Sequence, residues 1–224
     1  MILYRPTDGD VHANPLEFKP RTCFVMAQLG GSIPPELREA RKAFAEILPT
    51  YKYRQVDADG VTTGRDFLLK IWSLALAVPV GIAFIHRNIS ACTMANIFYE
   101  LGCMQAYGKE TLIVRIGGAE IPSDFVRTEY VDFDGHFERK VRGFLSALQE
   151  RADYYVILAK QLERNPLLAI DYVRRAYLLT GDQNLRRVAR RLFNEAGLGE
   201  RANNSVEQLL ISFCQPKRSR KRPA

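Results

Sequence analysis

Three side chains near the middle of the sequence have the types and spacing that chemistry at a sugar requires. Asn96, Tyr99 and Glu100 belong to the segment Asn-Ile-Phe-Tyr-Glu-Leu-Gly that ends at Gly102. On a helix, residues four apart share a face, so Asn96 and Glu100 lie together with Tyr99 beside them. A fixed carboxylate can stabilise or attack the positive charge that develops on a ribose when its C1′–N bond breaks. The alternative is that Glu100 is an ordinary solvated helix residue.

Alternating strand-like and helix-like segments surround these residues. Strands are predicted at 22–29, 51–56, 80–85, 111–116 and 129–133, where apolar residues form short runs. Helices are predicted at about 34–48, 64–77, 93–107 and 136–151. This alternation predicts an α/β fold with a flavodoxin-like parallel sheet and helices on both faces. The helix that carries Glu100 follows a central strand, so we expect its early turns near the carboxyl edge, where open α/β sheets bind ligands.

Further candidate binding residues follow the first three predicted strands. They are Gln28, Gly30, Gly31, Asp57, His86, Arg87 and Asn88. The glycines permit a phosphate or ribose to approach the backbone closely, and the alternative is a simple turn. His86 is either a base or a hydrogen-bonded structural residue, and Arg87 suits a phosphate-bearing substrate. Asp59 and Asp66 are further acids in the loop after the second strand.

The C-terminal third contains only helical patterns. Helices are predicted at 153–163, 166–179, 182–196 and 203–213, separated by Asn-Pro, Gly-Asp and Gly-Leu-Gly breaks. The predicted organisation is an extended lead-in at 1–21, an α/β domain at 22–150, a helical domain at 151–214 and a basic tail at 215–224. The fold class is therefore α/β followed by an all-α C-terminal region.

Positive charge is concentrated in this C-terminal part. Residues 1–150 hold 17 Lys/Arg and 18 Asp/Glu, whereas residues 151–224 hold 15 and 7. Arg186, Arg187, Arg190 and Arg191 recur at i, i+1, i+4 and i+5 and form one stripe. Such a stripe can bind nucleic-acid phosphates without sequence preference. The alternatives are a solvated helix face or a contact between subunits.

Composition indicates a globular cytoplasmic protein. The chain of 224 residues is 47% hydrophobic and 25% charged. Its longest apolar stretch, 71–85, is interrupted by Pro79 and is shorter than the ~20 residues of a membrane crossing. The N-terminal residues lack the basic start followed by an apolar run that is typical of a signal peptide, so we expect none. The four cysteines form no Cys-x-x-Cys pair, so we expect neither a metal site nor a disulfide framework.

The segment around Glu100 resembles a known family signature. It matches the Asn-x-x-Tyr-Glu-Leu-Gly-x-x-x-Ala-x-Gly-Lys pattern of the nucleoside 2-deoxyribosyltransferase-like proteins, which are related in fold to bacterial TIR domains. Segments 24–27, 54–57 and 121–125 are similar, in order, to the family's Phe-Val-x-Met-Pro, Arg-x-Asp and Pro-Phe-Asp-Leu segments. The resemblance covers about residues 22–135. One departure is that His86-Arg87-Asn88 stands where relatives carry an Asp after the third strand.

The resemblance implies an N-glycosidic hydrolase or transferase that acts on a nucleoside, a nucleotide or an NAD-type dinucleotide. Glu100 would be the catalytic carboxylate, while Asn96 and Tyr99 would shape the sugar pocket. NAD would be a substrate, and no cofactor is implied. The helical region would mediate assembly into a homo-oligomer, and relatives of this kind suggest a role in bacterial phage defence. The alternatives are a non-catalytic nucleotide-sensing module and a nucleic-acid-associated interaction protein.

Overall fold

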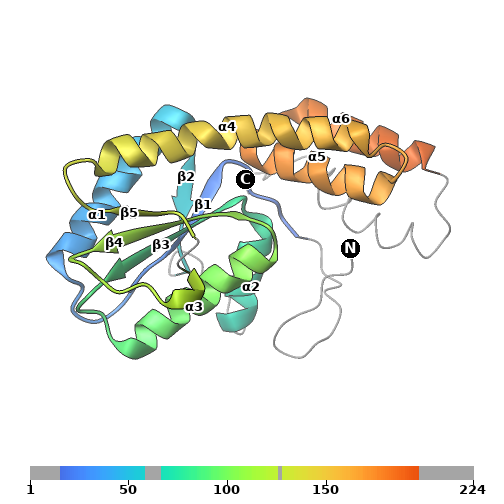
Figure 1. Cartoon of the computed structure of the whole chain (residues 1–224). Coiled ribbons are helices and arrows are strands. Elements are labelled where there is room, and N and C mark those ends of the chain that lie inside the picture. Colours follow the sequence, from blue (N-terminus) through green and yellow to red (C-terminus); the bar gives the residue numbers. More distant parts are fainter. Residues whose placement is uncertain (1–15, 59–66, 126–127, 197–224) are drawn as a thin grey trace, which may run out of the picture.

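A five-stranded sheet organises the residues that the computed structural model describes, which are 16–58, 67–125 and 128–196 (Figure 1). Its strands are β1 (Thr22–Met26), β2 (Arg54–Val56), β3 (Val80–His86), β4 (Glu110–Ile116) and β5 (Tyr130–Asp132). Their order is β2-β1-β3-β4-β5, and every neighbouring pair is parallel. This is the strand order of a flavodoxin-like sheet, so the predicted fold class is confirmed.

Helices cover both faces of the sheet. α1 (Pro35–Ile47) and α4 (Phe137–Gln161) lie on one face, and α2 (Phe67–Ala77) and α3 (Ala91–Ala106) lie on the other (Figure 1). Two short 3-10 turns, Leu48–Tyr51 and Ser123–Phe125, complete this part. Since β1 leads into α1 and β3 leads into α3 on the opposite face, the edge between these strands is the topological switch point of the sheet.

The centre of the sheet is apolar on both sides. All seven residues of β3 are buried, as expected for a strand covered on both faces. Gly81 makes room for two methionines, because an added Cβ would lie 3.0 Å from the methyl carbons of Met26 and Met104. Phe84 packs edge-on against Phe44 of α1, with ring centroids 5.7 Å apart. These contacts hold the central strand between its two layers of helices.

Helix α3 begins at a serine cap and packs against the sheet along one stripe. The Ser90 hydroxyl accepts a hydrogen bond from the backbone N–H of Thr93 at 3.2 Å, which satisfies an otherwise unpaired donor of the first turn. Ile97, Leu101 and Met104 recur at i, i+4 and i+7 and are all buried. This packing fixes the rotation of the helix and therefore the direction of its remaining side chains.

Helix α4 runs without interruption to residue 161, so the predicted break between 151 and 153 is wrong. Ala152 is buried and continues the apolar face of Leu145 and Leu148 into the next turn. No glycine or proline stands between Gly143 and Pro166 to end the helix. The expected domain boundary at residue 150 falls inside this helix, which belongs to both parts of the chain.

The last described helices form a second, smaller core. α5 (Pro166–Thr180) and α6 (Gln183–Glu195) pack with the second half of α4 around Val173, Leu185 and Leu192 (Figure 1). The helix predicted at 203–213 and the basic tail lie outside the described residues. Among the helices that are described, none is both long and apolar enough to cross a membrane.

The end of α5 is fastened to the sheet. The Tyr53 hydroxyl donates to the carbonyl of Leu179 at 2.9 Å, and the backbone N–H of Arg21 donates to the carbonyl of Leu178 at 2.8 Å. The Arg21 guanidinium also donates from Nε to the carbonyl of Thr180. These bonds satisfy carbonyls in the last turn of α5, and a cation there also suits the helix dipole. The helical part is therefore docked where β1 and β2 begin, at the edge opposite the switch point.

Candidate functional site

Two loops meet at the carboxyl edge of the sheet. β1 and β3 are direct neighbours, with Met26 paired to Ala83, so the segments that follow them leave the same edge. The structure thus places six of the predicted binding residues at the same edge of the sheet. They are Gln28, Gly30, Gly31, His86, Arg87 and Asn88.

His86 is held by hydrogen bonds at both ring nitrogens. Its Nδ1 accepts from the backbone N–H of Asn88 at 3.0 Å, and its Nε2 lies 3.2 Å from Oε2 of Glu36 in the first turn of α1. Because Nδ1 is an acceptor, the neutral ring carries its proton on Nε2 and donates it to the Glu36 carboxylate. The side chain is only 3% exposed. Of the two roles considered for His86, the contacts therefore favour the structural one.

Arg87 and Gln28 are two polar side chains of this edge with different surroundings. Arg87 is exposed and has no ion pair among the described residues. An added Cβ on Gly117, whose φ is +63°, would lie 3.3 Å from Oε2 of Glu36 and 3.4 Å from Nε of Arg87. Gln28 donates from Nε2 to the carbonyl of Gly30 at 2.8 Å, while its buried Oε1 has no hydrogen-bond partner in the described structure. The Arg87 guanidinium is thus open to a ligand, whereas the Gln28 amide oxygen is buried and unpaired among the described residues.

Asp57 has a structural partner. It follows β2 and forms an ion pair with Arg41 of α1, Oδ2 to Nη2 3.0 Å, in which both side chains are about a quarter exposed. This contact ties the end of β2 to α1 and occupies the carboxylate. The other candidate acids of this loop, Asp59 and Asp66, lie outside the described residues.

Glu100 lies apart from this edge, deep along α3. It follows Ala91 by nine residues, which places it about 13 Å along the helix axis from the start of α3. Glu100, Cys103 and Tyr107 recur at i, i+3 and i+7, and Tyr107 packs edge-on against Trp72 of α2 with ring centroids 6.1 Å apart. The Glu100 side chain therefore points along the flank of α3 that faces α2, and the single site expected from the sequence is divided into two groups.

Burial raises the pKa values of Glu100 and of its neighbour Cys103. It raises the pKa of Glu100 from the ordinary 4.5 to about 7, and no described cation pairs with the carboxylate. Burial also raises the pKa of Cys103, and the Glu100 charge raises it further. Tyr99 lies close to Cys103 and is 48% exposed, and Asn96 is exposed one turn earlier. A carboxyl that titrates near neutrality can act as an acid, a base or a nucleophile, which is the pattern of functional sites.

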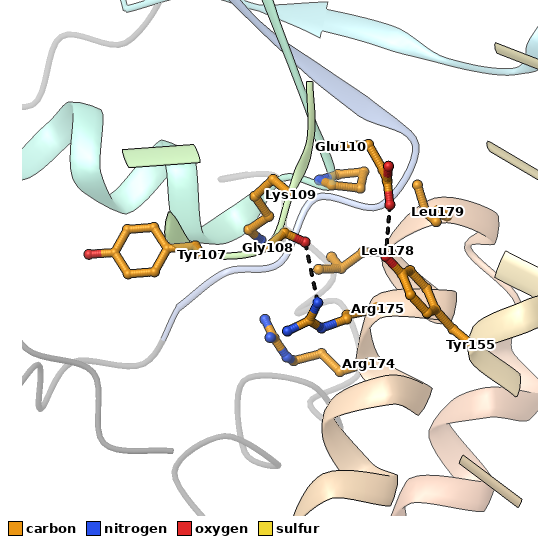
Figure 2. Close-up of a pocket in the computed structure, with 10 residues that line it drawn as sticks. Tyr107, Gly108, Lys109, Glu110, Tyr155, Arg174, Arg175, Leu178 and Leu179 are labelled. Atoms are coloured by element: carbon orange, nitrogen blue, oxygen red, sulfur yellow. Dashed lines mark hydrogen bonds between the residues drawn. The ribbon is translucent and has the colours of Figure 1, made fainter. Parts of the chain in front are cut away.

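A small cavity lies at the far end of α3, between β4, α4 and α5 (Figure 2). Its volume is about 10 Å³, the space of a single water molecule, so it does not hold a substrate. Figure 2 shows Arg175 donating from Nη1 to the carbonyl of Gly108 at 3.5 Å, and Tyr155 donating to Glu110 at 2.7 Å. These bonds join the end of α3 and the start of β4 to the helical part.

Lys109 is enclosed beside this cavity. Its Nζ donates to the carbonyl of Leu76 at 2.8 Å. Burial lowers the pKa of Lys109 well below its usual range, and the nearby Arg174 guanidinium lowers it further. The sequence places Lys109 in the Gly-Lys end of the signature but gives no sign of this burial, because Leu76 and Arg174 come from distant segments. We interpret Lys109 as a structural residue whose hydrogen bond connects the end of α2 to the start of β4.

Two remaining predictions concern α6 and metal binding. Arg187, Arg190 and Arg191 are exposed on one face of α6, and Arg186 is partly exposed beside them. Within the described ranges, no group of three or more His, Cys, Asp or Glu side chains could hold a metal ion. The described cysteines, Cys23, Cys92 and Cys103, are free thiols.

Comparison with known proteins adds no assignment. No protein-family model matches the chain. No curated protein matches it significantly. The relation to the nucleoside 2-deoxyribosyltransferase-like proteins therefore stays a prediction from the motif.

Proposed function

We propose that this protein cleaves or transfers at the C1′–N bond of a nucleoside, a nucleotide or an NAD-type dinucleotide, with Glu100 as the working carboxylate. The observation that carries the proposal is the state of Glu100. Its carboxyl is partly buried, has no cationic partner in the described structure, and has a pKa of about 7. Above pH 7 the ionised carboxylate has no cationic partner in the described structure, so its charge is available for a cation that develops beside it.

The chemistry follows from the two protonation states of Glu100. When the C1′–N bond breaks, its electron pair leaves with the base, and the ribose becomes an oxocarbenium cation. The ionised Glu100 carboxylate stabilises that cation or bonds to C1′, and water or an acceptor hydroxyl then completes the reaction. A departing purine or pyrimidine takes up one proton from solvent, whereas the nicotinamide of an NAD-type substrate leaves as a neutral molecule without one.

The neighbouring side chains have roles consistent with this reaction. The exposed ring of Tyr99 offers a face for a sugar or base, and the Asn96 amide offers hydrogen bonds one turn earlier. In this proposal the substrate lies along the flank of α3 that faces α2. The further proposals that follow from the motif are a cytoplasmic homo-oligomer, assembled through its helical part, and a role in phage defence.

A second candidate function is nucleotide sensing without turnover. The observation that favours it is the separation of Glu100 from the carboxyl edge, where Arg87 is exposed and open α/β sheets bind nucleotides. In a sensor, Arg87 would hold a phosphate while Glu100 contributed nothing to binding. Arg87→Gln would then abolish nucleotide binding, whereas Glu100→Gln would leave it unchanged.

A product screen tests the enzymatic proposal. Purified protein is incubated with NAD, NADP, ATP and a panel of ribo- and deoxynucleosides, and products are separated by chromatography and identified by mass spectrometry. Release of a free base by the wild-type protein, lost in Glu100→Gln, supports the proposal and identifies the substrate class. Glu39→Gln is the matched control, because Glu39 is exposed on α1 at the other face of the sheet. Equal turnover by the Glu100 and Glu39 variants removes Glu100 from the mechanism.

A further inference from the structure

Helix α6 presents a polar face dominated by arginine. Its apolar side packs into the second core through Leu185, Ala189 and Leu192. The opposite side consists of polar residues that together line an open depression. They are Gln183, Arg186, Arg187, Arg190, Arg191, Asn194 and Glu195. Four cations thus lie on one side of a helix of 13 residues.

The arrangement of these arginines opposes helix stability. Arg186 and Arg190, and likewise Arg187 and Arg191, stand four residues apart, and each such like-charge pair destabilises a helix by roughly 0.2–0.5 kcal/mol. Opposite charges also occur at this spacing, as Lys42–Glu46 in α1 and Glu138–Arg142 in α4. Helix α1 has one like-charge pair, Arg38 and Lys42, but among the described helices only α6 has two such pairs side by side. A face built only for solubility has no need of the repulsive pattern. An anionic partner would remove this repulsion.

The protein itself leaves much of this charge uncompensated. Arg187 and Arg190 are exposed and have no ion pair among the described residues. Arg191 lies 3.3 Å from Glu163, but both side chains are more than half exposed, so the pair is weak. Arg186 donates a hydrogen bond to the amide oxygen of Gln183 and lies over the Tyr177 ring. The face remains cationic.

We propose that the arginine face of α6 binds the phosphate backbone of nucleic acid without reading its sequence. Planar guanidinium groups match phosphate oxygens with two parallel hydrogen bonds, which lysine cannot do. Residues four apart on a helix are separated by about 6 Å along its axis, so the arginines form a regular row of charge. Phosphodiester chains are the partners whose charge also repeats at regular short intervals. This surface lies in the helical part and is independent of the chemistry proposed for Glu100.

Salt-dependent binding tests this proposal. Fluorescence anisotropy measures the affinity of the full chain for labelled duplex DNA and duplex RNA at several salt concentrations. Each arginine that neutralises one phosphate contributes about 0.9 to the slope of log affinity against log salt, so Arg187→Gln/Arg190→Gln should make the slope shallower by about 1.8. Between about 50 and 200 mM salt, the affinity of this variant should therefore fall by roughly 12-fold less than the affinity of wild type. The control, Arg38→Gln/Arg139→Gln, removes equal charge from exposed sites on α1 and α4.

The outcomes separate the possible partners. A shallower slope in the α6 variant alone, with the control equal to wild type, supports the proposal. Comparison of the affinities for DNA and RNA then identifies the preferred nucleic acid. Equal slopes in both variants overturn it, because the charge then acts from elsewhere in the chain. Binding to anionic phosphatidylserine vesicles without binding to either nucleic acid also overturns it, in favour of a membrane surface. Because both sites are exposed, circular dichroism should find both variants folded.

Discussion

Replacement of Glu100 by glutamine should make the folded protein more stable at alkaline pH and leave it nearly unchanged at acidic pH. Burial raises the pKa of Glu100 to about 7 in the folded protein, whereas the unfolded chain ionises near 4.5. Well below pH 4.5 the carboxyl is protonated in both states and makes no difference. Between these values the unfolded chain releases its proton first, so the folded state loses stability as the pH rises, and the full loss is present above pH 7.

The magnitude follows from the two pKa values. A difference of one in pKa corresponds to about 1.4 kcal/mol, so the stability of the variant relative to wild type should rise by about 2–3 kcal/mol between pH 5 and pH 8. Glutamine has nearly the same shape as glutamate and does not ionise in this range. For a chain of this size the corresponding difference in Tm is roughly 5–10 °C.

Thermal melts of wild type, Glu100→Gln and Glu39→Gln at pH 5 and pH 8 measure this effect. The Tm difference between wild type and Glu100→Gln should be largest at pH 8 and roughly a quarter as large at pH 5. Glu39→Gln should follow wild type at both values, because its carboxylate is exposed. An equal difference at both pH values would refute the reasoning, since the gain would then not come from ionisation of a buried carboxyl. Stability gained at the expense of turnover is the usual mark of a functional residue.

Three further predictions concern activity and the docking of the helical part. If ionised Glu100 is the reactive form, kcat should rise with pH through an apparent pKa near 7, and a flat profile would exclude this role. Tyr53→Phe leaves the carbonyl of Leu179 without its donor and should cost about 1–3 kcal/mol of unfolding free energy, measured by urea denaturation; an unchanged midpoint would mean that the bond contributes nothing. Gly108→Ala should lower the free energy of unfolding by about 1–2 kcal/mol, because φ is +63° and the new Cβ would lie 2.6 Å from Nη1 of Arg175; an unchanged thermal midpoint would show that the helical part yields freely.

Much of the fold follows from local patterns in the sequence. The apolar run of β3 predicts a strand covered on both faces, and the stripe of Ile97, Leu101 and Met104 predicts which side of α3 meets the sheet. The alternation of these elements then fixes the class of fold. The predicted break between residues 151 and 153 is wrong, because no residue there stops a helix and α4 continues to Gln161.

The site depends on contacts that no local pattern contains. His86 is tied to Glu36, fifty residues earlier, and this contact favours a structural role over that of a base. The titration of Glu100 depends on burial along the flank of α3 that faces α2, whereas its own neighbours in the sequence give only the type and spacing of the residues. Its separation from the carboxyl edge follows from where α3 begins, at Ala91, because each helical residue adds about 1.5 Å.

The most direct test of the central claim is the rate of base release from the substrate that the product screen identifies. The rate is measured at pH 7 for wild type, Glu100→Gln and Glu39→Gln under equal enzyme concentration. We predict that Glu39→Gln matches wild type, while Glu100→Gln is slower by roughly 10²–10⁴-fold, the usual contribution of a positioned acid or base. Equal rates for wild type and Glu100→Gln, or no base release by the wild-type protein from any compound of the panel, would contradict the proposal.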